Sequence, residues 1–323
     1  MSDFPTQTSG TKLPFIILLA IGIAALGIGG TYTLNKGDAT NPIVRFVTEV
    51  NPFKTPYDHL VLAIDTTNSA RTLHMEYATN LTSSITFSKT GLTQAVGAKI
   101  EGYLGGSTDG KIGKGEIRFS SLEDAGPSVT ISFIGTENGD AYYKFPSVVK
   151  WVHMTKEQLK EFNANSPTDA SLYSFDILGS VLSESKALFK GIEKNTIQKV
   201  SSEKADGKTY DTYAVEISTP AFIEALGKDP DSTEKDVKDA QIILKDATLK
   251  ATFSVEKESG YITKIGLEGK RLTQIPTPEG QAAGVSSVLH DMNLTADLTR
   301  FNLPADITVP GSKDVMEYDS SIL

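Results

Sequence analysis

Residues 72–77 read TLHMEY, and this short stretch decides the fold class because its side chains alternate in character. Leu73, Met75 and Tyr77 are apolar or aromatic, and the residues between them are polar. A period of two is typical of a β-strand with one buried face and one face in water. The preceding residues, up to about Ser69, have the apolar spacing of a helix instead. The chain is therefore predicted to change from helix to strand at this point.

Further strands with a similar alternation follow, and turn-forming residues separate them. Asn138-Gly139, Asp206-Gly207 and Ser259-Gly260 are typical of hairpin turns. Because parallel neighbours need longer crossovers, consecutive strands are predicted to form an antiparallel meander. After the strand at 72–77, separate strands are expected at about 83–89, 96–104, 114–120, 128–136, 140–145, 196–204, 208–218, 247–258, 261–271 and 285–301.

Helices are expected in blocks between these strands. Thr55 and Pro56 predict an N-cap followed by the first helical residue. Thr155 and Gln158 fit a capping box, in which each side chain satisfies a free backbone N–H of the helix start. The expected helical segments are 56–69, 155–192, 220–227 and 232–246.

The second helix of the middle block, at about 169–191, is unusually apolar. Between its ends only Asp176, Glu184, Lys186 and Lys190 carry charge. Such a helix is buried on much of its surface or lines an apolar space. Strands, then helices, then strands indicate an α+β fold, and we expect one strongly curved antiparallel sheet covered by helices.

An uncharged segment, LPFIILLAIGIAALGIGGTYTL, occupies residues 13–34 near the amino terminus. As a helix it would be about 33 Å long, which matches a hydrocarbon core of about 30 Å. A cleaved signal peptide, with a shorter apolar region, and a buried helix of a soluble domain are the alternatives. We predict an uncleaved transmembrane helix. Lys12 precedes it and Lys36 and Arg45 follow it, so the charge bias does not decide its orientation.

One large domain is expected to follow this membrane helix. Short amino-terminal tails followed by one anchor commonly export the rest of the chain, so we place the domain on the extracytoplasmic side of the cell membrane. The polar residues from Ser312 onward are predicted to be frayed. The expected organisation is a tail at 1–12, a single-pass transmembrane helix at 13–34, a juxtamembrane linker at 35–55, an extracytoplasmic domain at 56–312 and a C-terminal tail at 313–323.

The composition excludes several classes of protein. The chain has 323 residues and no cysteine, which excludes a disulfide scaffold, thiolate metal sites, a thiol nucleophile and a lipid-modified cysteine anchor. Its 31 basic and 40 acidic residues give a net charge of −9, which disfavours nucleic acid as a partner. The sequence does not indicate a protein partner.

The motifs of catalysis are absent or incomplete. Gly105, Gly110 and Lys111 have the spacing of a P-loop, but Ile112 stands where Ser or Thr would bind Mg²⁺. We therefore expect a glycine-rich hairpin loop there. The four histidines show no metal-ligand spacing, and no Gly-x-Ser-x-Gly element occurs. No catalytic residue, metal or cofactor is predicted, and the protein is not expected to be an enzyme.

Several segments together resemble the LolA/LolB and LppX/LprG type of bacterial lipoprotein-carrier proteins. They are the opening helix with its strand at 72–77, GDAYYKF at 139–145 followed by Trp151-Val152, VEKESGYITKI at 255–265, and FNLP at 301–304 followed by ITVP at 307–310. The resemblance covers roughly residues 56–312. It implies a half-barrel that holds acyl chains or other lipid between the sheet and a helical lid.

Apolar residues of the helix at about 169–191 and of the strands are the candidates for contact with such a ligand. They are Leu172, Phe175, Leu178, Val181, Leu182 and Phe189 on the helix, and Ile117, Phe119, Ile131 and Phe133 on strands. The alternative is that these residues fill a solid core, because apolar faces usually pack together. The domain would then be a non-catalytic structural or protein-interaction ectodomain. Without a cysteine for lipid attachment, the transmembrane helix would hold the domain, which favours a fixed acceptor or sensor over a diffusing carrier.

Overall fold

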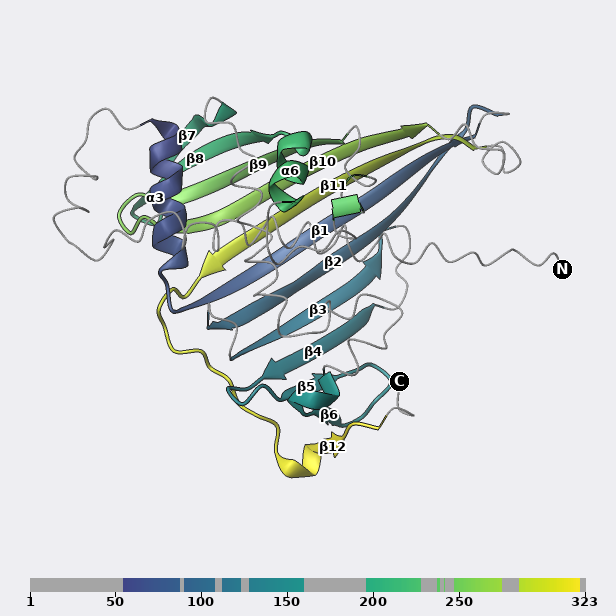
Figure 1. Ribbon diagram of the computed structural model, residues 1–323, viewed down its shortest axis with the longest axis vertical. Coiled ribbons are helices and arrows are strands. Elements are labelled where there is room, and N and C mark those ends of the chain that lie inside the picture. The colour runs from purple at the N-terminus through teal and green to yellow at the C-terminus, as the bar shows by residue number, and fades with distance from the viewer. Residues whose placement is uncertain are drawn as a thin grey trace.

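The fold is seen in a computed structural model, which describes residues 55–87, 90–107, 112–122, 128–159, 196–227, 237–238, 241, 247–274 and 285–319 (Figure 1). Within these residues, 12 strands form one strongly twisted sheet. In sheet order they are β12 (Val315–Glu317), β6 (Trp151–Met154), β5 (Ala141–Lys144), β4 (Val129–Gly135), β3 (Gly113–Ser121), β2 (Thr93–Ser107), β1 (Thr72–Phe87), β11 (Val285–Thr299), β10 (Ile262–Gln274), β9 (Ala247–Glu256), β8 (Lys208–Ile217) and β7 (Gln198–Ala205).

The predicted antiparallel meander is confirmed on both sides of the sheet. Strands β1 to β6 pair in chain order, and so do β7 to β11. The hairpin dipeptides lie in the turns as expected, with Gly139, Gly207 and Gly260 at positive φ. The strands that flank the P-loop-like segment, β2 and β3, are antiparallel neighbours, and Ser107 N donates to the carbonyl of Ile112 at 2.8 Å.

Two expectations about strands are wrong. The segments at 72–77 and 83–89 are one continuous strand, β1, whose polar middle is held because β2 and β11 pair with it on both sides. The C-terminal segment does not fray over all its length, because Val315–Glu317 forms β12 parallel to β6. The backbone N–H of Tyr318 donates to His153, and the His153 ring contacts the Glu317 carboxylate at 2.9 Å.

The pairing of β1 with β11 joins the two meanders into one sheet. Its register runs from His74 opposite Thr299 to Phe87 opposite Val285, with one irregularity next to Phe87. These partners are more than 190 residues apart in the chain, so no local turn sets their register. A slip of one residue would move every side chain to the other face of the sheet, and burial of one face therefore fixes the register.

Among the described residues, the helices α3 (Pro56–Asn68) and α6 (Thr219–Gly227) pack on the same face of the sheet (Figure 1). The α3 helix starts with the predicted Thr55 cap, and Asp58 completes a capping box. Its buried side chains include Leu60 and Ile64. Thr67 ties the end of α3 to the sheet, since its Oγ1 accepts a hydrogen bond from the backbone N–H of Ile262 at 2.9 Å.

Several expected helices lie partly or wholly outside the described residues. The transmembrane segment at 13–34 and the apolar helix at 169–191 fall there, as does most of 232–246. The capping box of Thr155 and Gln158 is confirmed, with the Thr155 N–H donating to Gln158 Oε1 at 2.9 Å. In the part of the chain that the structure describes, no helix is both long enough and apolar enough to cross a membrane.

The sheet is most crowded where β2 passes β3. A Cβ atom at Gly102 would overlap the backbone oxygen of Glu116, and it would lie 3.1 Å from the Tyr77 hydroxyl. The backbone of Glu116 cannot move aside as the end of a flexible side chain can. The absence of a side chain at Gly102 therefore lets the two strands approach at this bend.

Replacing Gly102 with alanine is expected to destabilise the fold by about 1–3 kcal/mol, the usual cost of overpacking. Chemical denaturation followed by circular dichroism measures it. Gly227→Ala is the control, because its Cβ would meet nothing closer than Val237 Cγ2 at 3.9 Å. An unchanged unfolding midpoint for Gly102→Ala would contradict the close strand approach.

Candidate functional site

One face of the sheet carries a continuous apolar surface, which we call the core face. Odd-numbered residues of β1 point to it, and Leu73, Met75, Tyr77 and Thr79 are all buried. Strand register extends each of these positions into a row across the sheet. One row consists of Tyr213, Phe253, Ile265, Ala296, Tyr77, Gly102, Ile117 and Ile131. The same face is therefore apolar over eight neighbouring strands.

The four strand residues predicted to contact a ligand lie together on this core face. Ile117 pairs with Ile131 across β3 and β4, and Phe133 sits opposite Gly115 one row away. Ile117, Ile131 and Phe133 are buried, and Phe119 is half-buried against the same core. The six predicted helix residues, from Leu172 to Phe189, lie outside the described residues. Contact between the two groups therefore stays a prediction.

A cleft of about 340 Å³ opens on the core face between α3 and the sheet, and we call it the α3 cleft. It lies at the end of the sheet where α3 is bonded to Ile262. Its walls combine apolar and ionisable side chains. They are His59, Leu62, Ala63 and Thr66 of α3, Asp211 and Tyr213 of β8, Val255 of β9, and Lys257, Glu258, Ser259 and Gly260 of the β9–β10 turn.

Asp211 is a buried carboxylate in the wall of this cleft, with 6% of its surface exposed. Lys199 Nζ contacts its Oδ2 at 2.8 Å, and the Ser202 hydroxyl donates to its Oδ1 at 2.6 Å. Burial alone would raise the pKa of Asp211. The hydrogen bonds from Lys199 and Ser202, with the positive charges of Lys199 and Lys257, outweigh burial and hold this pKa below its usual range. The group is ionised at neutral pH.

Tyr77 and Tyr213 are among the tyrosines of the core face whose pKa is raised by burial. Burial, with a smaller effect of the neighbouring Asp211 charge, raises the pKa of Tyr213 to about 12. Burial and then the charge of Glu116 raise the pKa of Tyr77. Among the described side chains, the Tyr77 hydroxyl is the buried polar group that lacks a hydrogen-bond partner. Both phenols remain neutral at physiological pH, so they offer neither an anion nor a general base.

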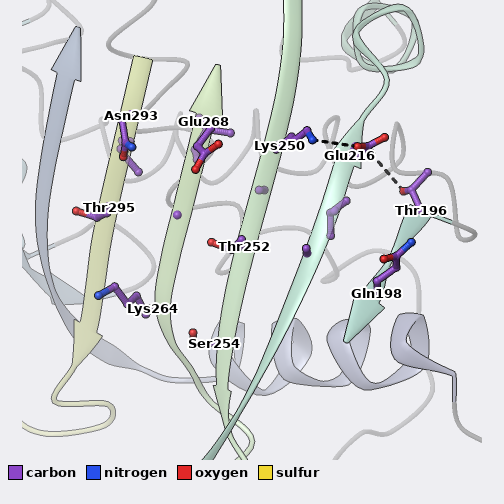
Figure 2. Close-up of a pocket in the computed structure, with 16 residues that line it drawn as sticks. Thr196, Gln198, Glu216, Lys250, Thr252, Ser254, Lys264, Glu268, Asn293 and Thr295 are labelled. Atoms are coloured by element: carbon purple, nitrogen blue, oxygen red, sulfur yellow. Dashed lines mark hydrogen bonds and ion pairs between the residues drawn. The ribbon is translucent and has the colours of Figure 1, made fainter. Parts of the chain in front are cut away.

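A larger hollow of about 820 Å³ lies on the opposite, polar face of the sheet (Figure 2). Small residues form its floor, since Ala214, Thr252, Gly266 and Thr295 succeed one another in register from β8 to β11. Other polar side chains lie on both sides of this floor, as Figure 2 shows. They include Thr196, Gln198, Glu216, Lys250, Ser254, Lys264, Glu268 and Asn293.

The chemistry of this polar hollow does not match an apolar ligand. Lys250 Nζ lies 3.3 Å from Glu216 Oε1, and the Thr196 hydroxyl donates to the Glu216 carbonyl at 3.3 Å. Both members of the Lys250–Glu216 pair are largely exposed, so the pair adds little stability. An acyl chain placed here would cover these polar groups without replacing their contacts with water. The polar hollow is therefore not the predicted ligand site.

The α3 cleft was not predicted, although the sequence holds a signal for it. In the strand predicted at 208–218, Tyr213, Val215 and Ile217 alternate on the inward face. The same period places Asp211 inward as well, where a carboxylate is costly without a partner. Its partners Lys199 and Ser202 lie on β7, and the irregular pairing between Lys199 and Ser201 hides their register.

Comparison with known proteins gives a likeness of fold. No protein-family model and no curated protein sequence matches the chain. Similar solved structures include LppX, LprF and a LolA superfamily protein. The lipoprotein LppX of Mycobacterium tuberculosis is 11% identical, with a TM-score of 0.33 over 78% of this chain and 98% of that chain. LprF from Mycobacterium bovis is 11% identical, with a TM-score of 0.36 over 79% and 96%.

A LolA superfamily protein from Nitrosomonas europaea is 9% identical, with a TM-score of 0.15 over 73% of this chain and 87% of that chain. These are proteins of the type that the sequence resembles. At such identities and TM-scores, the likeness says nothing about ligand, activity or partner.

Replacing Asp211 with asparagine is expected to lower the free energy of unfolding at pH 7 by about 1–3 kcal/mol, because a charged hydrogen-bond acceptor is lost. The pKa of an Asp side chain in the unfolded chain is about 3.9, and that of Asp211 in the folded protein is lower. The ionised carboxylate therefore stabilises the folded protein fully at pH values above about 3.9, and this contribution is lost as the pH falls through the pKa of the folded state. The variant should therefore lose less stability than the wild type on acidification from about pH 5.

Urea denaturation at a series of pH values measures this difference. Asp297→Asn is the control, since Asp297 is more than half exposed and lies 3.9 Å from Lys264, and it should change stability little. Equal acid sensitivity of Asp211→Asn and the wild type would show that the buried pair is not ionised as described.

Proposed function

We propose that this protein is a membrane-anchored, extracytoplasmic domain that binds a lipid, an acyl chain or another apolar molecule. The ligand would lie between the core face of the sheet and a helical lid formed by residues 169–191. The observation that carries the proposal is the continuous apolar core face, which crosses eight strands from β4 to β8. The domain would act without catalysis, as a fixed acceptor or sensor.

The size of the core face supports a further covering element. At about 4.8 Å per strand, the strands from β4 to β8 span roughly 34 Å. The helices α3 and α6, with 13 and 9 residues, are only about 20 and 13 Å long. The apolar segment at 169–191 would be about 34 Å long as a helix, which matches the span of the face. Its apolar residues fit a lid over Ile117, Phe119, Ile131 and Phe133.

Membrane attachment is proposed from the sequence of residues 13–34. Their uncharged length suits one bilayer crossing, and the missing cysteine leaves no lipid-modified anchor. Residues 35–55 would link this helix to the domain. We place the domain outside the cytoplasmic membrane, in the cell envelope, where a tethered apolar site can exchange its ligand with the bilayer or with a carrier.

Uptake of a fluorescent fatty acid tests the ligand site. The full chain, kept soluble in amphipol, should give a saturable rise in fluorescence, because the probe leaves water for an apolar space. Leu178→Arg, in the proposed lid, should abolish this rise, because an unpaired charge in that space is costly. Leu303→Arg is the matched control, since Leu303 is 55% exposed, and it should bind like the wild type.

Thermal unfolding shows whether each variant remains folded. A folded wild type that takes up no probe would contradict the ligand site and favour the solid-core ectodomain. Uptake that is equal in Leu178→Arg and the wild type would remove residues 169–191 from the site.

A further inference from the structure

The β1–β2 hairpin ends in an exposed apolar tip. We define the hairpin tip as Ile85, Phe87, Leu92, Val96 and the neighbouring Leu289 of β11. Leu92 is 67% exposed, and Val96 and Leu289 are each 38% exposed. From Ala78 to Ala98 the only charged residue is Lys89, although 22% of the whole chain is charged. An exposed apolar surface with so little charge indicates an interaction site.

The hairpin tip is apolar on both faces of the sheet. Val96 pairs with Ser83 and therefore lies on the core face, whereas Leu289 pairs with Ser84 and lies on the polar face. Leu92 sits in the turn between the two strands. The β1 and β2 strands converge with β11 at the upper right of Figure 1, at one extremity of the sheet. Apolar side chains therefore flank the tip on both faces of the sheet, as insertion into an apolar layer requires.

Hydrogen bonds make the hairpin tip a rigid element. Gly91 N donates to the Phe87 carbonyl and Phe87 N donates to the Leu92 carbonyl, both at 2.9 Å. The β1 strand is paired with β2 and β11 to its last residues. Its backbone groups therefore need no water, as an apolar environment requires. On the outer edge of β2, the described hydrogen bonds to the β3 side reach Gly97, whose carbonyl accepts from Leu122 N at 3.0 Å. The proposed contact is with the hydrated lipid interface, where backbone groups nearer the tip can bond to water.

We propose that the hairpin tip docks into the interfacial layer of the bilayer that anchors the protein. This inference rests on the proposed membrane anchor at residues 13–34. An interfacial element enters by about 5–10 Å, which is about three residues of strand. Counted from Leu92, that depth reaches Leu289, which lies level with Ala95, and it leaves Val96 at the boundary with water and Lys99 and Asp291 beyond it.

The length of the linker allows this docking. The α3 helix is bonded to Ile262 at the opposite end of the sheet, roughly 40 Å from the hairpin tip along β1. Residues 35–54, if extended, reach at most about 70 Å. The anchor and the hairpin tip can therefore occupy the same bilayer. The tip would then hold the sheet end-on to the membrane, with the α3 cleft facing away from it.

Single-cysteine labelling tests the docking directly, because the natural chain has no cysteine. The full chains of Leu92→Cys and Leu303→Cys are labelled with a polarity-sensitive fluorophore and reconstituted in phosphatidylcholine vesicles. Leu303 is the matched control, since its carbonyl is bonded to Thr72 at the opposite end of β1. The label at 92 should shift its emission to the blue and be quenched by head-group nitroxide lipids. The label at 303 should be quenched only by aqueous iodide.

A label at a second position tests whether the fluorophore itself, rather than the side chain of Leu92, causes the insertion. A label at Gln94→Cys should show the same blue shift, and Leu92→Asp in that background should abolish it. Circular dichroism confirms that each variant is folded. A blue shift that persists with Leu92→Asp would overturn the proposal.

The remaining outcomes separate the docking from the anchor. If the chain floats with vesicles after an alkaline wash but the label at 92 stays accessible to iodide, the docking is overturned and the anchor stands. If the chain does not float, the anchor and the docking are both overturned. The protection of the label at 92 from iodide could also decrease as the ratio of lipid to protein rises. That result would assign the hairpin tip to contact with a second copy of the chain and would also overturn the proposal.

Discussion

The structure depends on one strand pairing, between β1 near the start of the domain and β11 near its end. This pairing aligns two separate meanders into one sheet and sets which side chains share a face. Because side chains alternate along a strand, its register places the apolar residues of eight strands on one surface. The core face, the α3 cleft beneath the helix and the apolar hairpin tip all follow from that register.

The two faces of the sheet have different chemistry, and this difference separates the candidate sites. The larger hollow lies on the polar face and offers neutral and paired charged groups, so it does not suit an acyl chain. The core face is apolar and contains buried phenols in place of charges. Its buried carboxylate, Asp211, lies at the edge near α3, where it pairs with Lys199 and accepts a hydrogen bond from Ser202. A hydrophobic ligand is therefore proposed for the core face.

Local sequence patterns predicted most of the strands and the antiparallel pairing of consecutive ones, but not the pairing of β1 with β11 that joins the two meanders. Period-two alternation and the Asp206-Gly207 and Ser259-Gly260 turns located hairpins within a few residues. The polar run from Thr82 to Ser84 broke the alternation, so β1 was predicted as two strands, although its pairing on both sides makes it one. The pairing of Val315–Glu317 with β6 and the salt bridge of Asp211 are long-range, and no local pattern indicates their partners. Four predicted ligand residues share the core face, and contact with the six on the helix remains a prediction.

Native mass spectrometry of the full chain, extracted from membranes in mild detergent, tests the central claim most directly. The account predicts a population heavier than the bare chain by the mass of one lipid, which is released at higher collision energy and is lost in Leu178→Arg. A folded chain that carries only its own mass, and that gains none when lipid is added back, would contradict an apolar ligand site and leave the core face as a solid core.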